Sequence, residues 1–241
     1  MTACQTARTP LPPLPTDTPL PPTFTPTATI AWFPPTATLT PFPTIAITPT
    51  VDIHPELGQL LLKEEFTDPA QWNLSTTDTK SAILGKNELS LALTQPGGYI
   101  FSVFQKKLPL DYYIEMTASP NLCRGEDQYG VLLRFTPSQE FYRFSLSCDG
   151  RARLDKYFHG TASSPMPWTY SSSIPPGAPS QSRIGVLVKG KEMDFFVNGE
   201  FLFSVRDPSI PSGKLGVFAR SAGDNAVTIN FSDLEIYEAA S

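Results

Sequence analysis

Many features that would point to a specific chemistry are scarce or missing in this chain of 241 residues. It has only two histidines, His54 and His159, and no Gly-x-Ser-x-Gly motif, so a serine-hydrolase triad is not predicted. Zinc-ligand spacing, a phosphate-binding loop and a dinucleotide fingerprint are all missing. Lysine and arginine do not cluster and the net charge is −5, which argues against a nucleic-acid partner. No apolar run reaches the roughly eighteen residues of a membrane-spanning helix, so none is predicted.

The amino-terminal segment is rich in proline and threonine and almost uncharged. Residues 1–50 hold half of the 26 prolines of the chain, and their only charged side chains are Arg8 and Asp17. Proline fixes φ and removes backbone donors, and little apolar surface is available here to offset the entropy of folding. We therefore predict that residues 5–54 form a disordered, semi-rigid stalk of polyproline type, followed by one folded domain over residues 55–241.

A possible membrane anchor precedes this stalk. Met1-Thr2-Ala3-Cys4 has a small residue directly before a cysteine and resembles the lipobox of bacterial lipoproteins, in which that cysteine carries the lipid. The resemblance implies lipidation at Cys4, residues 1–4 as the remnant of a signal sequence, and an extracytoplasmic, surface-anchored or secreted protein. The charged and apolar regions of a signal peptide do not precede Cys4 in this sequence. Cys4 as an incidental cysteine of a soluble protein therefore stays an alternative.

The other two cysteines can form a disulfide. Residues 128–135 and 140–147 have the pattern of a β-hairpin that turns around Ser138, which brings Cys148 opposite Gln128 and close to Cys123. If Cys4 carries a lipid, Cys123 and Cys148 are left as a pair, which suits an oxidising compartment. Two free buried thiols are the alternative.

The rest of the chain has the alternation of β-strands and no sustained helical period. Asn198-Gly199 supplies the two positive φ angles that a type I′ hairpin turn needs. Many short strands without a helix predict an all-β, two-sheet antiparallel sandwich. The predicted strands cover residues 60–66, 81–84, 88–93, 99–105, 112–118, 129–135, 141–147, 152–158, 182–189, 192–197, 201–205, 214–220 and 227–237.

The hairpin around Asp149-Gly150 can be assigned a register. A three-residue loop with Gly150 in the left-handed conformation places Phe144 opposite Leu154 on an apolar face. The other face then pairs Arg143 with Asp155 and Ser145 with Arg153. Opposite charges directly across from one another favour this arrangement in a sheet with one solvated face.

The order of these features resembles the concanavalin A-like lectin/glucanase superfamily, especially its laminin-G-like and 3-keto-disaccharide hydrolase-like domains. The matching pieces are EEFTDPAQWNLS, QYGVLLRF with EFYRFSLSCDGRARL, GVLVKGKEMDFFVNGEFLFSVRD and GKLGVFARSAGDNAVTINFSDLEIYE, within residues 60–238. The resemblance implies a jelly-roll sandwich and a carbohydrate ligand. It does not fix an activity, because the fold hosts lectins, glycosidases and adhesion modules.

An enzyme is not the favoured interpretation. Glucanases of this superfamily carry three carboxylates on one strand, and the nearest match here is Glu192-Met193-Asp194, with Val197 in place of the third. Glu126 and Asp127 are adjacent, so their carboxylates would point to different faces of a strand. We therefore interpret them as loop residues that could bind calcium. No other cofactor is predicted.

The favoured interpretation is a surface-anchored, non-catalytic module that binds carbohydrate. We expect residues 160–180 to form a long loop that arches over the polar sheet face and brings two aromatic rings to it. Two alternatives stay open, a glycoside-hydrolase-like enzyme acting on a disaccharide or glycan, and an adhesion or structural domain in which Trp168 belongs to the core. The candidate sugar-binding residues are Arg143, Arg153, Asp155, Tyr157, Trp168 and Tyr170.

Overall fold

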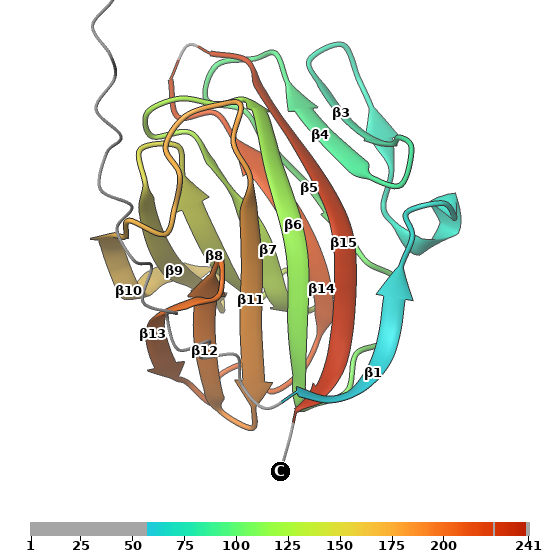
Figure 1. Cartoon of the computed structure of the whole chain (residues 1–241), viewed down its shortest axis with the longest axis vertical. Coiled ribbons are helices and arrows are strands. Elements are labelled where there is room, and N and C mark those ends of the chain that lie inside the picture. Colours follow the sequence, from blue (N-terminus) through green and yellow to red (C-terminus); the bar gives the residue numbers. More distant parts are fainter. Residues whose placement is uncertain (1–56, 224, 240–241) are drawn as a thin grey trace, which may run out of the picture. The chain divides into compact units, whose positions relative to one another are not determined.

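The segments with alternating apolar residues are antiparallel strands (Figure 1). The computed structural model describes residues 57–223 and 225–239. The predicted stalk, residues 5–54, and Cys4 lie outside the described residues. The sheets predicted from the sequence are confirmed, and the only helical element within the described ranges is one short 3-10 turn, Pro69–Gln71. In that part of the chain, no helix has the length and hydropathy needed to cross a membrane.

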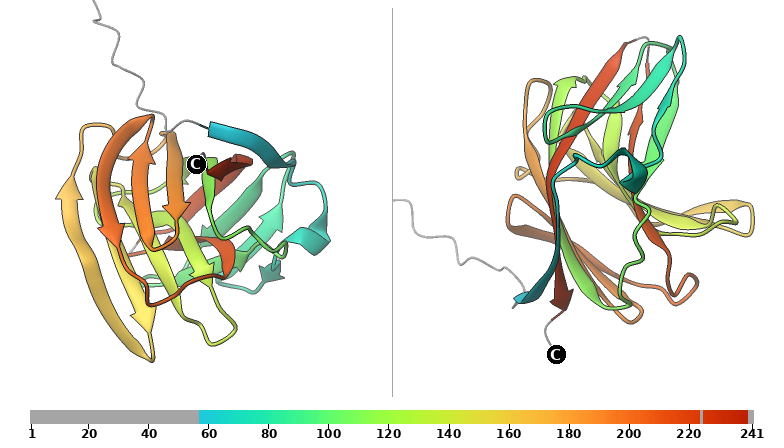
Figure 2. Two further views of the ribbon diagram at one scale, coloured as in Figure 1. Left: turned by 90° about the horizontal axis from the view of Figure 1, so that it is seen from below. Right: turned by 90° about the vertical axis from the view of Figure 1, so that its right-hand side faces the viewer.

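Two antiparallel sheets face each other (Figure 2). In spatial order the nine-stranded sheet contains β13 (Glu200–Arg206), β12 (Glu192–Val197), β11 (Ser182–Lys189), β6 (Tyr112–Leu122), β15 (Val227–Ala239), β4 (Leu89–Leu93), β3 (Lys80–Leu84) and β2 (Ser75–Thr76), and β1 (Leu57–Glu64) also pairs with β15. The six-stranded sheet contains β10 (Thr161–Tyr170), β9 (Arg151–Phe158), β8 (Phe141–Ser147), β7 (Gln128–Phe135), β14 (Lys214–Arg220) and β5 (Tyr99–Val103). In Figure 1 the nine-stranded sheet faces the viewer, and β7 to β9 lie behind it.

The core fills the space between the two sheets. Phe144 of β8 lies 4.7 Å from Phe195 of β12 and 5.9 Å from Phe203 of β13, measured between ring centroids. These three rings belong to one buried apolar cluster that includes residues from both sheets. Each buried side chain of this size contributes on the order of 2 kcal/mol to stability. The core therefore uses the inner side of both sheets and leaves their outer sides to polar and aromatic residues.

The predicted register of the β8–β9 hairpin is confirmed. Arg143 pairs with Asp155, and Phe144 pairs with Leu154 on the inner side. The β7–β8 hairpin differs by one residue, because Gln128 pairs with Ser147 and not with Cys148. Two residues with positive φ lie where the chain turns back, Arg134 at the end of β7 and Gln139 in the turn that follows.

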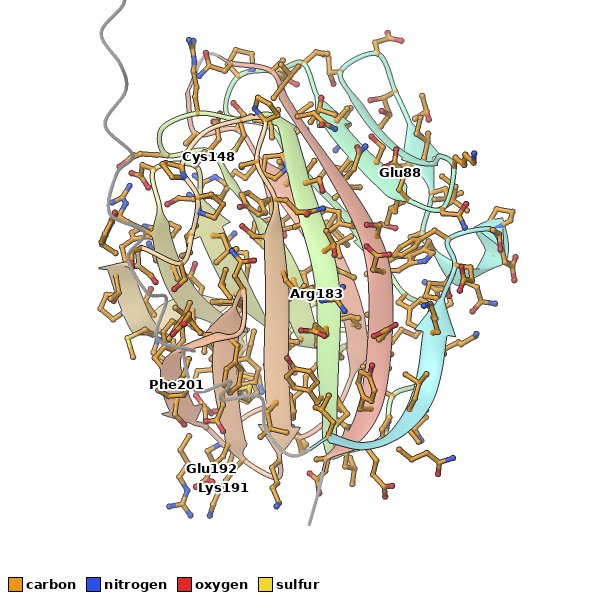
Figure 3. The ribbon with its side chains drawn as sticks, viewed as in Figure 1. Glu88, Cys148, Arg183, Lys191, Glu192 and Phe201 are labelled. Atoms are coloured by element: carbon orange, nitrogen blue, oxygen red, sulfur yellow. A yellow bond between two sulfur atoms is a disulfide. The ribbon has the colours of Figure 1, made fainter. Side chains whose placement is uncertain are left out.

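The predicted disulfide between Cys123 and Cys148 is confirmed. Their Cα atoms are 5.9 Å apart, and the bridge joins the segment after β6 to the β8–β9 turn (Cys148 is labelled in Figure 3). The Asn198-Gly199 turn is confirmed as well, with φ angles of 52° and 81°.

The segment expected to be a loop over residues 160–180 is largely a strand. Its first half forms β10, which pairs with β9 at the free edge of the six-stranded sheet. Two register shifts interrupt this pairing, around residues that include Pro165 and Pro167. Proline cannot donate to a ladder hydrogen bond, so it is tolerated on an edge strand and at bulges. These prolines, together with the small polar residues at the start of β10, have the composition of a loop, which is why the sequence did not predict this strand.

Candidate functional site

The outer face of the six-stranded sheet carries a cluster of two arginines and one aspartate, which we call the arginine–aspartate cluster (Arg143, Arg153 and Asp155). Asp155 is only 2% exposed, and its carboxylate accepts a hydrogen bond from Arg143 Nη2 at 2.8 Å and one from Arg153 Nε at 2.5 Å. The Ser164 hydroxyl of β10 donates to the same carboxylate at 2.7 Å. The carboxylate is therefore fixed by three partners from three neighbouring strands, a geometry that needs the register described above.

Aromatic rings cover Arg143. Its guanidinium carbon lies 5.0 Å from the ring centroid of Tyr157, 5.5 Å from that of Phe218 and 6.0 Å from that of Tyr99. These contacts leave Arg143 only 8% exposed, although it points away from the core. A cation over an aromatic face is attracted by the quadrupole of the ring, and this attraction grows when water is excluded.

Trp168 of β10 lies over the same face. Its ring centroid is 5.2 Å from the guanidinium carbon of Arg151 and 5.7 Å from that of Arg153. Ion pairs with Asp149 at 2.5 Å and with Glu126 at 2.9 Å hold Arg151 beneath the ring. Trp168 stays partly exposed. The interpretation of Trp168 as a core residue is therefore wrong, because its ring packs against two cations of the outer face.

An aromatic row crosses the same sheet face next to the cluster; it consists of Phe101, Phe135, Phe141 and Tyr157, one ring each from β5, β7, β8 and β9. Successive ring centroids are 5.6, 5.5 and 4.7 Å apart. Phe101 is 38% exposed, and the other three rings are partly exposed. A contiguous exposed apolar row of this kind is typical of a binding surface. Single exposed apolar residues, by contrast, are common on any protein surface.

A β-bulge places Phe135 in this row. Alternation from Leu133, which belongs to the core, would send Phe135 inward as well. Arg134 between them has a φ of 53°, and the pairing with β14 shifts register at this point. The bulge turns Phe135 to the outer face, where it stacks on Phe141. The chain passes so close to the bulge at Gly213 that a Cβ there would lie 2.2 Å from the Arg134 carbonyl carbon.

The aromatic row ends at a large cleft along the free edge of β5, which we call the edge cleft. Its volume is about 1370 Å³. Tyr99, Phe101 and Phe135 form the wall that it shares with the sheet face. Asn73 and Gln105 also line the cleft, and Gln105 donates to the Val103 carbonyl at 2.8 Å and to the Asn73 side chain. The other residues that line the cleft are Leu74, Ser75, Lys80, Ile100, Val103, Lys107, Leu108, Pro109, Leu110, Thr136, Pro137, Gln139, Ser212, Gly213 and Lys214.

The segment that forms one end of the edge cleft is anchored by buried polar contacts. Lys156 Nζ donates to Asp207 Oδ2 at 2.6 Å, and Arg134 Nη1 donates to the Ile210 carbonyl at 2.8 Å. Burial acts to raise the pKa of Asp207, but hydrogen bonds from Lys156 and Ser209 outweigh it and lower this pKa to about 2. The folded state therefore holds Asp207 in its ionised form.

This shift predicts a pH dependence of stability. A carboxyl whose pKa is lower in the folded state stabilises the protein above its unfolded pKa of 3.8, and this contribution is lost as the pH falls toward 2. We expect Asp207→Asn to lower the free energy of unfolding by about 2 kcal/mol at pH ~7 and to flatten its decline between pH ~4 and ~2. Urea unfolding across this pH range measures both effects. The exposed Asp78→Asn is the control, and an unchanged acid slope in Asp207→Asn would contradict the prediction.

Three polar atoms of the sheet face have no hydrogen-bond partner within the described residues. They are Tyr99 Oη, Arg143 Nε and Ser145 Oγ, and all three are buried. Burial raises the pKa of Tyr99 to about 12 even though the nearby Arg143 opposes the shift, so its hydroxyl stays protonated at neutral pH. Buried polar groups are usually satisfied. The outer face of the six-stranded sheet therefore has three buried polar atoms that are available for further hydrogen bonds.

Tyr170 is not brought to this group. It is 72% exposed and lines a separate hollow of about 110 Å³ with Phe201 of β13 (Phe201 is labelled in Figure 3). Within residues 57–223 and 225–239, no ring contact, hydrogen bond or ion pair joins it to the arginine–aspartate cluster. The bulges of β10 separate it from Trp168.

The carboxylates that we considered for catalysis or for calcium binding are engaged in contacts within the protein. Glu192 lies at the end of β12 and pairs with Arg206 at 3.7 Å (Figure 3). Asp127 is buried and accepts hydrogen bonds from the backbone N–H groups of Ala222 and Arg124, while Glu126 pairs with Arg151. Both residues lie in the loop between β6 and β7, as the sequence predicted, and Asp127 is buried there as an internal anchor. The described residues contain no group of three or more His, Cys, Asp or Glu side chains placed to hold a metal ion.

A second polar cluster lies on the outer face of the nine-stranded sheet. Glu115 and Glu235 are cross-strand partners, and Arg183, labelled in Figure 3, bridges them at 2.9 and 3.5 Å. Glycoside hydrolysis needs a general acid with a raised pKa. Here the Tyr237 hydroxyl and Lys63 lower the pKa of Glu235. The arrangement therefore relieves repulsion between two glutamates and does not supply an acid–base pair.

Comparison with known proteins supports the fold alone. No protein-family model and no curated protein matches the chain. The carbohydrate-binding module CBM66 of Bacillus subtilis is similar with a TM-score of 0.55 and 12% identity, over 70% of this chain and 96% of that one. A laminarinase catalytic domain from Thermotoga petrophila is similar with a TM-score of 0.54 and 10% identity, over 76% and 98% of the two chains.

A further solved structure has the same architecture. A Bacillus subtilis protein of unknown function with a galectin-like fold has a TM-score of 0.57 and 12% identity, over 76% of this chain and 97% of that one. At these identities the likenesses show a shared sandwich and not a shared chemistry. They confirm the predicted two-sheet sandwich fold, while membership of the concanavalin A-like superfamily and the resemblance to 3-keto-disaccharide hydrolase-like domains stay predictions.

Proposed function

We propose that this domain is a non-catalytic carbohydrate-binding module that holds its glycan on the outer face of the six-stranded sheet. The observation that carries the proposal is the partly exposed Trp168 ring, which has the guanidinium groups of Arg151 and Arg153 over its face. An aromatic ring stacks on the apolar side of a sugar, and the part-exposed guanidinium groups of Arg151 and Arg153 can donate to its hydroxyls, while the buried Asp155 positions Arg153. Similar solved structures include a carbohydrate-binding module and a glucan-hydrolysing domain, which supports this ligand class.

The binding interpretation is favoured over an enzyme for a specific reason. On this face the one buried carboxylate, that of Asp155, is bonded to Arg143 and Arg153. Both of its oxygens accept hydrogen bonds from neighbouring side chains, so this carboxylate is not free to protonate a glycosidic oxygen. Hydrolysis of a glycosidic bond would need a second carboxyl on the opposite side of the sugar. The other carboxylates that the structure places near Trp168, those of Asp149 and Glu126, both pair with Arg151, so the face favours stacking and hydrogen bonding.

The test is a glycan-array screen of the full chain followed by titration of the best ligand. We expect Trp168→Ala to cost about 2 kcal/mol of binding free energy, a roughly thirtyfold loss of affinity, because a central aromatic contact is removed. Tyr170→Ala is the matched control, since it removes an exposed aromatic ring from the same strand, and it should leave the affinity unchanged. Equal affinity of Trp168→Ala and the unsubstituted chain would overturn the proposal.

The proposal includes display at a cell surface. A lipid at Cys4, followed by a stalk over residues 5–54, would hold the glycan-binding face away from the membrane. The disulfide between Cys123 and Cys148 supports an oxidising, extracytoplasmic compartment. The reading frame upstream of Met1 tests the anchor. A basic segment followed by an apolar run would support it, and a stop codon directly upstream would refute it.

A further inference from the structure

The edge cleft differs in charge from the rest of the molecule. Among the described residues that line it are Lys80, Lys107 and Lys214, and none is Asp or Glu. The whole chain carries a net charge of −5, so a cleft with three cations and no carboxylate is a local reversal of sign. A concave site lined by one sign of charge concentrates ligands of the opposite sign.

The lysine charges are not neutralised by neighbours. Lys214 Nζ donates to the neutral Gln105 side chain at 2.7 Å. Lys80 and Lys107 are exposed, and no ion pair joins either of them to a carboxylate within residues 57–223 and 225–239. A ligand anion would therefore meet cations that need not first break an ion pair, which avoids one of the costs of binding.

The other lining groups suit a sugar chain. Tyr99, Phe101 and Phe135 contribute rings to the lining, and Asn73 and Gln105 contribute side-chain amides. The volume of about 1370 Å³ exceeds the roughly 300–1,000 Å³ that is usual for a small-molecule site, so an oligomer fits better than a monomer. Phe101 and Phe135 also belong to the aromatic row. A chain bound on the sheet face can therefore continue into the cleft.

A peptide strand is a poorer occupant. The end of β5 that faces the cleft is already bonded, because Asn73 N donates to the Val103 carbonyl at 3.1 Å and Gln105 N donates to the Gln71 carbonyl at 2.8 Å. The Ser102 hydroxyl also donates to the Asn73 carbonyl at 2.9 Å. Strand addition needs a run of free backbone groups along the edge, and this segment occupies part of it.

We propose that the edge cleft is a subsite for acidic sugar units, and that the ligand is an oligosaccharide bearing carboxylate or sulfate groups. The lysines bind the anions, the amides bind hydroxyls, and the rings stack on the sugar faces. This inference rests on the proposed function, because the acidic chain is the extension of the glycan held beside Trp168. It adds the charge of the ligand, which the sheet face alone does not specify.

The test compares charged and neutral forms of one sugar chain on the full-length protein. An oligogalacturonate and its carboxyl-reduced, neutral form are titrated by calorimetry, in parallel with dextran sulfate and dextran. We expect the charged form of at least one pair to bind about tenfold or more tightly than its neutral partner at low salt, and this preference to shrink as salt screens the lysines. The pair that shows the preference identifies carboxylate or sulfate as the anion.

Two double variants with the same change in net charge locate the effect. Lys80→Gln with Lys107→Gln removes two cations from the cleft, and Lys86→Gln with Lys191→Gln removes two exposed cations that do not line it. We expect only the cleft variant to lose the preference for the charged form, by about tenfold. Equal losses in both variants, or no preference in any pair, would overturn the inference.

The two proposals fail in different ways. If Trp168→Ala weakens binding of neutral and charged chains alike while the cleft variant changes nothing, the sheet-face site stands and the acidic subsite is refuted. If the cleft variant abolishes binding of the charged chain while Trp168→Ala has no effect, the cleft is an anion site and the sheet-face proposal is wrong. Binding to anionic lipid vesicles with no glycan affinity would overturn the inference in favour of a membrane surface.

Discussion

Replacement of Asp155 by alanine is expected to lower the free energy of unfolding by about 3–5 kcal/mol. Among the described residues, this carboxylate is the only acidic partner of Arg143, and both side chains are almost completely buried. Without Asp155, the guanidinium of Arg143 would stay in a low-dielectric setting among aromatic rings, with no opposite charge nearby. Breaking a buried ion pair on one side is costly because the surviving charge keeps its desolvation penalty.

Two controls distinguish this effect from the loss of any aspartate. Asp149 pairs with Arg151 on the same hairpin, but its side chain is 33% exposed, so Asp149→Ala should cost less than about 1 kcal/mol. Conversion of both partners, Arg143→Leu with Asp155→Leu, should recover part of the lost stability because no buried charge is then left alone. Urea unfolding gives all three values. A loss in Asp155→Ala no larger than in Asp149→Ala would show that the cluster is effectively solvated.

The strand pairing that builds this cluster could be predicted because several signals agree. Charges and apolar residues alternate with the same period along β8 and β9, and Gly150 fixes the loop between them, with a φ of 87°. A shift by one residue would have placed Arg143 in the core, so only one register is compatible with the sequence. The disulfide followed from the same reasoning, although the β7–β8 register was predicted one residue off.

The aromatic row and the edge cleft could not be predicted in the same way. Phe135 reaches the outer face only because the bulge at Arg134 reverses the alternation, and nothing in the local sequence marks a bulge there. The edge cleft is formed by segments far apart along the chain, from Asn73 to Lys214. Its charge emerges only when packing brings three isolated lysines together. Strand β10 was missed for a different reason, because its prolines suggest a loop unless the strand lies at an edge.

Removal of the disulfide is the second change with a large expected effect. The double variant Cys123→Ser with Cys148→Ser should lose about 3 kcal/mol of stability, because an unfolded chain without the cross-link regains the entropy of an open loop. The two cysteines are 25 residues apart, which sets the size of that loop. Chemical unfolding at equal protein concentration, with and without reductant, measures the effect. Reduction should destabilise the unsubstituted chain by the same amount and leave the double variant unchanged.

The folded structure should survive this loss. Cys148 N donates to the Asp127 carbonyl at 3.0 Å, and Gly177 N donates to the Cys148 carbonyl at 2.8 Å, so the backbone near the bridge keeps its hydrogen bonds. Asp127 also accepts from Ala222 N at 2.9 Å, which ties the same loop to the segment after β14. Cys4→Ser is the control, since it removes a cysteine without touching the bridge. If reduction leaves the unfolding midpoint of this control unchanged, the bridge does not stabilise the fold. The disulfide would then be evidence only for an oxidising compartment.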